Sequence, residues 1–249
     1  MVSTGSPPEA TAAWVDWVDW AVERFGHSLR IACSLAVEDC LLVDAVAERA
    51  AKLGLARERS PSVFVLDTGR LHEESYQVLE ALRERYDLEF DVKFPSPERL
   101  EPLLRAKGAL SFFASTEARR ECCAVRKVEP LGRALLGASA WMTGQRRTQA
   151  VTRAELPVLE RDEAHGGLAK VNPLALVNDV ELRAEVERRR VVVHPLHGRG
   201  YPSIGCAPCT RAVSPGEDAR AGRWWWEDPA HKECGLHPAR VTPRAGSDT

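Results

Sequence analysis

Five of the seven cysteines in this 249-residue chain stand in three settings that suggest chemistry. Cys122 and Cys123 are adjacent, Cys206 and Cys209 form a Cys-x-x-Cys pair, and Cys234 stands alone near the carboxy end. Four thiolates are the number that completes a tetrahedral zinc site or a [4Fe–4S] cluster. A fifth, separate thiol is a candidate nucleophile. We therefore predict a redox enzyme that carries a metal cofactor.

The adjacent pair favours the cluster over zinc. Neighbouring side chains on a helix diverge by about 100°, so two vicinal thiolates reach a broad cubane more readily than a single ion. We predict one [4Fe–4S] cluster, with a structural zinc ion or four ordinary cysteines as the alternatives. The metal ligands of this prediction are Cys122, Cys123, Cys206 and Cys209. Cys33 and Cys40 fall within an apparent strand and helix, and we interpret both as structural.

The candidate nucleophile has basic neighbours in the sequence. Cys234 reacts only as a thiolate, and the pKa of a free thiol is about 8.5. His237, three residues on, and nearby basic side chains could lower that pKa. Lys127 would lie near the cluster if residues 119–135 are helical, and there it would offset cluster charge or meet an anionic substrate. The plainer alternatives are a spare thiol and a solvated helix face.

Short apolar runs alternate with helical stretches through the first part of the chain. The predicted strands are residues 29–33, 62–66, 88–94 and 138–142, and the predicted helices are residues 14–25, 40–53 and 73–86. This alternation predicts right-handed βαβ units and a mainly parallel sheet flanked by helices, hence an α/β fold. Ligands of such sheets bind beyond the carboxyl ends of the strands.

Three polar segments fall at those strand ends: Ser34, residues 67–70 and residues 144–147. Residues 34–39 resemble a bend that binds phosphate with the amides of a helix N-terminus. The bend contains no glycine and does not match the glycine-rich phosphate loop. The alignment of all three segments nevertheless predicts a ligand site at this edge of the sheet.

The composition limits the classes of partner and the compartment. The net charge of −2 gives no support for binding nucleic acid or membranes, whereas local basic clusters suit a small anionic ligand. No apolar run approaches the roughly 18 residues of a membrane span, and the amino end lacks the pattern of a signal peptide. An odd number of unevenly spaced cysteines fits a reducing compartment. We expect a cytoplasmic protein.

The sequence predicts one domain with a disordered segment at each end. We expect residues 1–8 to be a disordered lead, residues 9–237 to form a single domain, and residues 238–249 to be a flexible tail. After about residue 197, Gly, Pro and Cys become frequent and periodicity fades. We therefore expect residues 198–237 to form a C-terminal arm that wraps over the sheet and carries Cys234.

In order, these motifs resemble the assimilatory sulfonucleotide reductases, in particular the adenylylsulfate (APS) reductase branch. The paired cysteines separate this branch from most phosphoadenylylsulfate (PAPS) reductases, which share the final Glu-Cys-Gly-Leu-His. The matching segments are Ser34-Leu-Ala-Val-Glu-Asp39, Leu66-Asp-Thr-Gly-Arg70, Cys122-Cys-Ala-Val-Arg-Lys-Val-Glu-Pro-Leu131, Thr143-Gly-Gln-Arg-Arg-Thr-Gln149, Lys170-Val-Asn-Pro-Leu174, Gly200-Tyr-Pro-Ser-Ile-Gly-Cys-Ala-Pro-Cys-Thr-Arg211, Gly216-Glu-Asp-Ala-Arg-Ala-Gly-Arg-Trp-Trp-Trp226 and Lys232-Glu-Cys-Gly-Leu-His237.

The resemblance implies a fold and a reaction. The fold is that of the adenine-nucleotide α-hydrolases, or PP-loop enzymes. The reaction is the reduction of APS to sulfite and AMP in sulfate assimilation for cysteine biosynthesis. Cys234 attacks the sulfur of APS to leave a thiosulfonate, and a reduced thioredoxin then releases sulfite. In this family the cluster is expected to tune the electrostatics near the substrate and to order the site.

The resemblance also implies roles for individual residues. A positively charged collar would hold the substrate: Lys127, Arg220, Arg223 and His237, with Arg146 and Arg147 assisting. The nucleotide pocket would be lined by Ser34, Glu38, Asp39, Leu66, Asp67, Thr68, Gly69 and Arg70. Ala150 stands where the family usually has Ser, so any hydroxyl contact there is absent.

Other functions stay open at this level. The substrate could be PAPS, or both nucleotides, because no dedicated pocket for a 3′-phosphate is evident. A PP-loop enzyme that thiolates tRNA with ATP is a more distant alternative, although its Ser-Gly-Gly-x-Asp-Ser loop is not matched by residues 34–39. The non-enzymatic alternative is a nucleotide-binding module with a structural zinc ion. The sequence does not decide whether the chain forms a homo-oligomer or which thioredoxin serves it.

Overall fold

The computed structural model describes residues 5–150 and 153–228. Its centre is a six-stranded sheet in the order β3-β2-β1-β4-β6-β5. All neighbours pair in parallel except β5, which is antiparallel to β6. The strands are β1 (Leu29–Ala32), β2 (Ser62–Leu66), β3 (Glu89–Lys93), β4 (Ala140–Met142), β5 (Leu159–Asp162) and β6 (Leu168–Val171).

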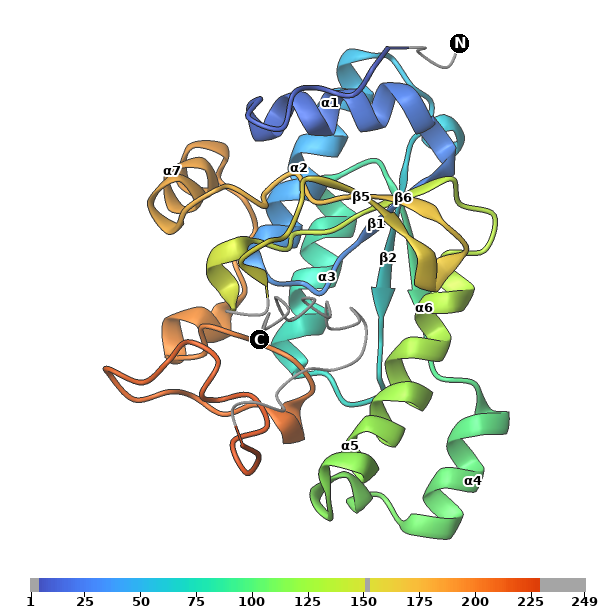
Figure 1. Cartoon of the computed structure of the whole chain (residues 1–249), viewed down its shortest axis with the longest axis vertical. Coiled ribbons are helices and arrows are strands. Elements are labelled where there is room, and N and C mark those ends of the chain that lie inside the picture. Colours follow the sequence, from blue (N-terminus) through green and yellow to red (C-terminus); the bar gives the residue numbers. More distant parts are fainter. Residues whose placement is uncertain (1–4, 151–152, 229–249) are drawn as a thin grey trace, which may run out of the picture.

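Helices cover both faces of this sheet, with α2 and α3 on one face and α6 on the other (Figure 1). The α-helices are α1 (Trp14–Phe25), α2 (Val37–Lys52), α3 (Glu73–Arg85), α4 (Pro97–Lys107), α5 (Thr116–Cys123), α6 (Glu129–Ala134) and α7 (Asp179–Arg189), and a π-helical segment (Ala124–Val128) joins α5 to α6. Short 3₁₀ turns are η1 (Gly26–Ser28), η2 (Arg57–Arg59), η3 (Ser111–Phe113), η5 (Arg147–Gln149), η7 (Glu163–His165), η8 (Pro195–Arg199) and η9 (Ala207–Cys209).

The alternation of side chains along the strands divides the core between the two faces. Val63, Val65 and Met142 belong to the larger cluster, which also contains the buried faces of α1, α2 and α3. Phe64 and Trp141, one position out of step, pack with the buried residues of α6 in the smaller cluster. Continuous apolar runs are therefore required in β2 and β4, because each strand is buried on both faces.

The mainly parallel α/β sheet is confirmed, and the four apolar runs form β1 to β4 within a few residues of the expected bounds. Residues 119–135 are helical apart from one terminal position, although a π segment interrupts the α-helix. The antiparallel pair β5–β6 and the helices α4 and α7 were not anticipated. The sequence of β5, Leu-Glu-Arg-Asp, carries one apolar residue in four and lacks the signal of a buried strand.

The order of the strands creates a switch point beside β1. The chain passes from β1 to β2 and β3 on one side, and then returns to place β4 on the other side of β1. Crevices at such a switch point, beyond the carboxyl ends of the strands, are where open α/β sheets bind ligands. The arrow of β2 points toward the end of the molecule that holds α5 and the segment 190–228 (Figure 1).

None of the helices in the described ranges is long and apolar enough to cross a membrane. Two of the predicted site residues, Cys234 and His237, lie outside the described residues.

Candidate functional site

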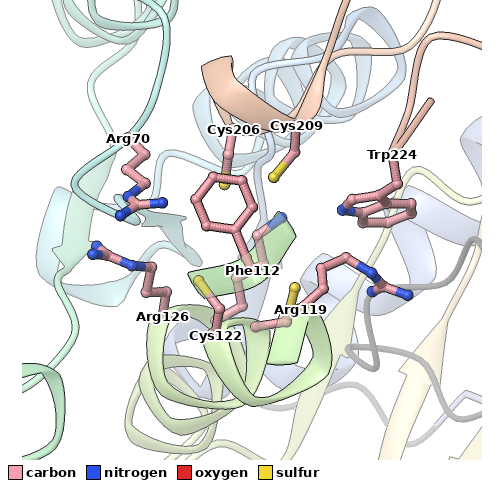
Figure 2. A pocket seen from close by; sticks show the side chains of 10 residues that line it. Arg70, Phe112, Arg119, Cys122, Arg126, Cys206, Cys209 and Trp224 are labelled. Carbon is pink, nitrogen blue, oxygen red and sulfur yellow. The ribbon is translucent and has the colours of Figure 1, made fainter. Parts of the chain in front are cut away.

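Four cysteine thiols line one pocket between α5 and η9. Figure 2 shows the sulfur atoms of Cys122, Cys206 and Cys209 directed toward a common space. All six cysteines in the described ranges are free thiols. The complete lining of this thiol pocket is Arg70, Phe112, Arg119, Cys122, Cys123, Arg126, Lys127, Cys206, Cys209 and Trp224.

Local sequence places each of the two adjacent thiols on a helix face that it shares with one cation. Ser115 caps α5 by accepting a hydrogen bond from the Ala118 N–H at 3.1 Å. Cys122 and Cys123 close the last turn of α5, and Arg126 and Lys127 follow each of them by four residues. Side chains four residues apart share a helix face, so both cations line the pocket that the thiols line. The π segment that contains them is a distortion that recurs at functional sites.

The Cys206-x-x-Cys209 turn is held in place by the loop that follows β2. The Thr68 hydroxyl lies 3.3 Å from the Cys206 sulfur, and the Ala207 N–H donates to the Arg70 carbonyl at 2.8 Å. Thr210 closes the turn by donating from its hydroxyl to the Cys206 carbonyl at 3.0 Å. These contacts join the loop after β2 directly to the thiol pocket.

Positive charge is crowded around these thiols. Arg70 and Arg126 lie on one side of the pocket, and Arg119 lies on the other beside Trp224 (Figure 2). Burial lowers the pKa of Arg70, and the neighbouring Arg126 lowers it further, while the thiolates oppose both effects. Guanidinium groups that destabilise each other favour an anionic occupant between them.

These surroundings shift the pKa values of the thiols in opposite directions. Burial by itself would raise the pKa of Cys206, but Lys127, the Thr68 hydrogen bond and nearby arginines bring it below its ordinary value. Burial, together with the negative charge of Cys206, raises the pKa of Cys209 to about 12. Burial also raises the pKa of Cys122. Four thiolates at this place consequently need a positively charged group among them.

The donor set fits an iron–sulfur cluster better than one metal ion. Thiols are the ligands that such clusters use. No three His, Cys, Asp or Glu side chains of the described ranges are arranged to hold a single metal ion. The four thiols line one common pocket, and the side chains of the two adjacent cysteines diverge there.

A second group of predicted residues meets at the switch point. Asp39, in the first turn of α2, accepts hydrogen bonds from the N–H and the hydroxyl of Ser34 at 2.8 and 2.5 Å. It also accepts from the Gly144 N–H, beyond β4, at 3.0 Å. Burial raises the pKa of Asp39 to about 6, although these hydrogen bonds favour its charged form. Leu35, which follows Ser34 in the loop that leads to Asp39, has a φ of 66°, a left-handed conformation that is unusual for a leucine.

Glu38 and Arg146 form the second link across the switch point. Arg146 donates to Glu38 at 3.0 Å and to Asp179 at 2.7 Å, and Gln149 donates to Glu38 at 3.0 Å. Arg146 is almost fully buried, so this pair holds the loop after β4 against α2. Arg147 is exposed and donates to the Leu156 carbonyl at 2.8 Å.

The loop after β2 completes this edge of the sheet. Asp67 accepts from the Gly69 N–H at 2.8 Å and from the Tyr76 hydroxyl at 3.2 Å, which fixes a tight turn. Gly69 has a φ of 68°, which favours glycine. Arg126 donates to the Thr68 carbonyl at 2.5 Å and joins this loop to the thiol pocket.

The structure thus brings most of the predicted residues together in two adjoining groups. Arg223 is buried, with its guanidinium 4.7 Å from the Trp224 ring, and it donates to the Ile204 carbonyl. Arg220 is not among the residues that line the thiol pocket. The sequence marked Arg119 and Arg126 only as members of basic clusters suited to a small anion, and it gave no signal for Phe112.

The family model for the phosphoadenosine phosphosulfate reductase domain matches residues 31–212. Two curated relatives are called adenosine 5′-phosphosulfate reductase. The protein from Burkholderia cepacia is 46% identical over 244 residues, covering 97% of this chain and 94% of the relative. The protein from Allochromatium vinosum is 44% identical over 247 residues, covering 99% of this chain and 92% of the relative.

Solved structures with the same architecture are more distant in sequence. A PAPS reductase from Candida auris, in a phosphate complex, has a TM-score of 0.65 at 23% identity and covers 82% of this chain and 91% of its own. An FMN adenylyltransferase from Candida glabrata, bound to FMN and an ATP analogue, has a TM-score of 0.53 at 14% identity, with coverage of 82% and 67%. These two likenesses concern the fold.

Proposed function

The chain belongs to the phosphoadenosine phosphosulfate reductase family, in its adenosine 5′-phosphosulfate branch, and we propose that it reduces APS to sulfite and AMP with thioredoxin as the reductant. The observation that carries the proposal is the pocket in which two cysteine pairs face four basic side chains. It adjoins the switch point where an α/β sheet binds a nucleotide. The curated relatives named for this reaction support the choice of substrate.

The nucleotide is proposed to bind over the carboxyl ends of β1, β2 and β4. Backbone amides at the start of α2 would receive the phosphate group, because a helix N-terminus favours an anion. Asp39 and Glu38 hold the loops after β1 and β4 in register for this purpose. The sulfate group would then extend past Thr68 and Arg70 toward the thiol pocket, into the field of the crowded cations.

We propose that Cys122, Cys123, Cys206 and Cys209 hold one [4Fe–4S] cluster. Bound there, the cluster would supply a fixed charge distribution beside the sulfate group. On the thiol side of this pocket, the charges of Lys127 and Arg126 and the hydroxyl of Thr68 lower the pKa of Cys206. Lys127 and Arg70 also offer positive charge to an anionic substrate that approaches the pocket mouth, as preorganised cations do at a developing negative charge.

In the reaction that we propose, the thiolate of Cys234 attacks the sulfur of APS. A sulfur–sulfur bond forms, and the bond between sulfur and the phosphate oxygen breaks with its electron pair leaving on AMP. One thiolate of reduced thioredoxin then attacks the Cys234 sulfur and releases sulfite, and its second thiol closes the thioredoxin disulfide. Thioredoxin is oxidised by two electrons and the sulfur of the substrate is reduced by two. His237 would support the thiolate of Cys234.

Residues 9–237 are proposed to act as one catalytic unit, in which the segment 198–237 carries the nucleophile. The described part of this segment supplies Cys206, Cys209 and Trp224 to the thiol pocket. We propose a cytoplasmic location and a role in sulfate assimilation for cysteine biosynthesis, since free thiols and a thioredoxin partner require a reducing compartment.

Sulfite release is the direct test of the proposal. Anaerobically purified protein should release sulfite from APS only when reduced thioredoxin is present, and faster than from PAPS. Without reductant, mass spectrometry of the peptide containing Cys234 should show an added SO₃ group. Cys234→Ser should abolish the adduct and the sulfite while it leaves the iron content, about four per chain, unchanged.

Each part of the proposal fails on a separate result. If protein prepared without oxygen contained zinc in place of iron, the proposed cluster would be ruled out. Faster turnover of PAPS would change the substrate. Sulfite production by the Cys234→Ser variant would exclude the covalent mechanism.

A further inference from the structure

Arg119, which lines the thiol pocket, forms a buried ion pair with Glu227. Arg119, in α5, donates from Nε and from one terminal nitrogen to the two carboxylate oxygens at 2.6 and 2.9 Å. The Arg119 side chain is 0% exposed and that of Glu227 is 3% exposed. The two residues are 108 positions apart, so the pair joins the cysteine-bearing helix to the far end of the described chain.

Aromatic side chains enclose this pair. The Arg119 guanidinium lies 4.5 Å from the Trp224 ring centre, so the cation stacks on an aromatic face. Trp226 packs on Phe113 with ring centres 4.4 Å apart, and Phe113 in turn packs on Phe112 at 4.3 Å. The segment 224–227 is thereby held from both sides, by the ion pair and by the rings of η3.

The pair also touches the thiols. Burial by itself would lower the pKa of Arg119, but the bonds to Glu227 and the neighbouring Cys123 sulfur raise it above its ordinary value. Arg119 therefore contacts a predicted cluster ligand and the anchored segment at once. A displacement of Glu227 would be transmitted to the helix turn that bears Cys122 and Cys123.

Stability alone does not account for such an arrangement. Well-packed apolar side chains of similar volume commonly stabilise a fold as well as a buried ion pair does. A two-pronged pair fixes the relative orientation of its two side chains, because the planar guanidinium donates two parallel hydrogen bonds to a carboxylate. The geometry set here is that of the chain at Glu227, seven residues before Cys234.

We propose that Arg119 and Glu227 are a positioning pair for the nucleophile, an inference that rests on the function proposed above. Seven residues span at most about 24 Å, so the fixed point at Glu227 limits the volume in which the Cys234 sulfur can lie. Loss of the fixed point enlarges that volume and lowers the effective concentration of the thiolate at the substrate. The pair is proposed to act through the chain and through α5.

The test measures the formation of the SO₃ adduct on Cys234 in a single turnover without reductant. Glu227→Gln removes the charge at constant size and is expected to slow the adduct by about tenfold or more. Its iron content and its affinity for AMP should equal those of the unaltered protein. Glu217→Gln is the matched control, because Glu217 accepts two bonds from Arg211 at 2.9 and 2.8 Å in the same segment but on the surface. The control should form the adduct within about twofold of the normal rate.

Arg119→Lys gives an independent measurement, since it keeps the charge and loses the two-pronged geometry. A slow adduct in either variant at full iron content supports positioning. Normal adduct rates in both variants would overturn it. A loss of activity that only follows a loss of iron in both variants would also overturn it and leave a structural role. If the unaltered protein forms no adduct, the proposed function itself has failed, which is a different result.

Discussion

Gly144 should be required at the switch point because no side chain fits there. A Cβ atom at this position would overlap the carboxylate of Asp39 and would lie 2.9 Å from the Glu38 Cβ and 3.1 Å from the Asp39 backbone nitrogen. The last two atoms belong to the start of α2 and cannot swing aside as a flexible side chain would. Gly144→Ala must therefore push the loop after β4 away from α2.

The size of the effect follows from two contributions. Overpacking of a tight site costs about 1–3 kcal/mol. Loss of the hydrogen bond from the Gly144 N–H to Asp39, which is 3.0 Å long, adds about 0.5–1.5 kcal/mol. Together these are about 1.5–4.5 kcal/mol, or roughly a 10-fold to 2,000-fold loss of nucleotide affinity if the displaced loop must return for binding.

Calorimetric titration with AMP, the proposed product, measures this loss directly. Gly132→Ala is the matched control, because Gly132 lies in α6 and a Cβ there would meet nothing within 4 Å. The control should bind AMP normally and gain about 0.5–1 kcal/mol in unfolding free energy. Both variants should keep their iron, since the thiol pocket is built from other loops. Unchanged AMP affinity in Gly144→Ala would refute the assignment of the switch point as the nucleotide site.

Three further expectations concern single side chains. Lys127→Gln should slow sulfite release by about 10-fold to 100-fold at unchanged iron content, and an unchanged rate would show that its charge does not act on the substrate. Thr68→Val removes the hydroxyl 3.3 Å from the Cys206 sulfur and should make the potential of the proposed cluster more negative in a redox titration, whereas an equal potential would contradict this hydrogen bond. Burial of His194, with a smaller contribution from His197, lowers its pKa to about 4, so the unfolding free energy should fall by up to about 3 kcal/mol as pH drops from about 6.5 to about 4. Chemical denaturation at several pH values should show this slope flattened in His194→Gln and retained in the exposed-site control His27→Gln, and equal slopes in all three proteins would disprove it.

Four of the six strands and most of the helices could be predicted because their signals are local. Burial on both faces demands a continuous apolar run, and β2 and β4 carry one. The edge strand β5 escaped prediction because its pairing with β6 depends on a neighbour, and its own residues are mostly charged. Helical spacing suggested that Lys127 lies near Cys122, since a helix has a fixed period, and Lys127 lines the same pocket as the four cysteines.

The amino-acid sequence by itself determined the α/β class and the family to which the chain belongs, and it singled out two cysteine pairs as candidate cluster ligands. Only the tertiary structure brought Cys122 and Cys123 to Cys206 and Cys209, across more than eighty residues of chain. The pairing of Arg119 with Glu227 likewise has no local signal. The reason is physical. Periodicity records which face of an element is buried, but contacts between distant segments follow from the path of the whole chain and from the packing that closes it.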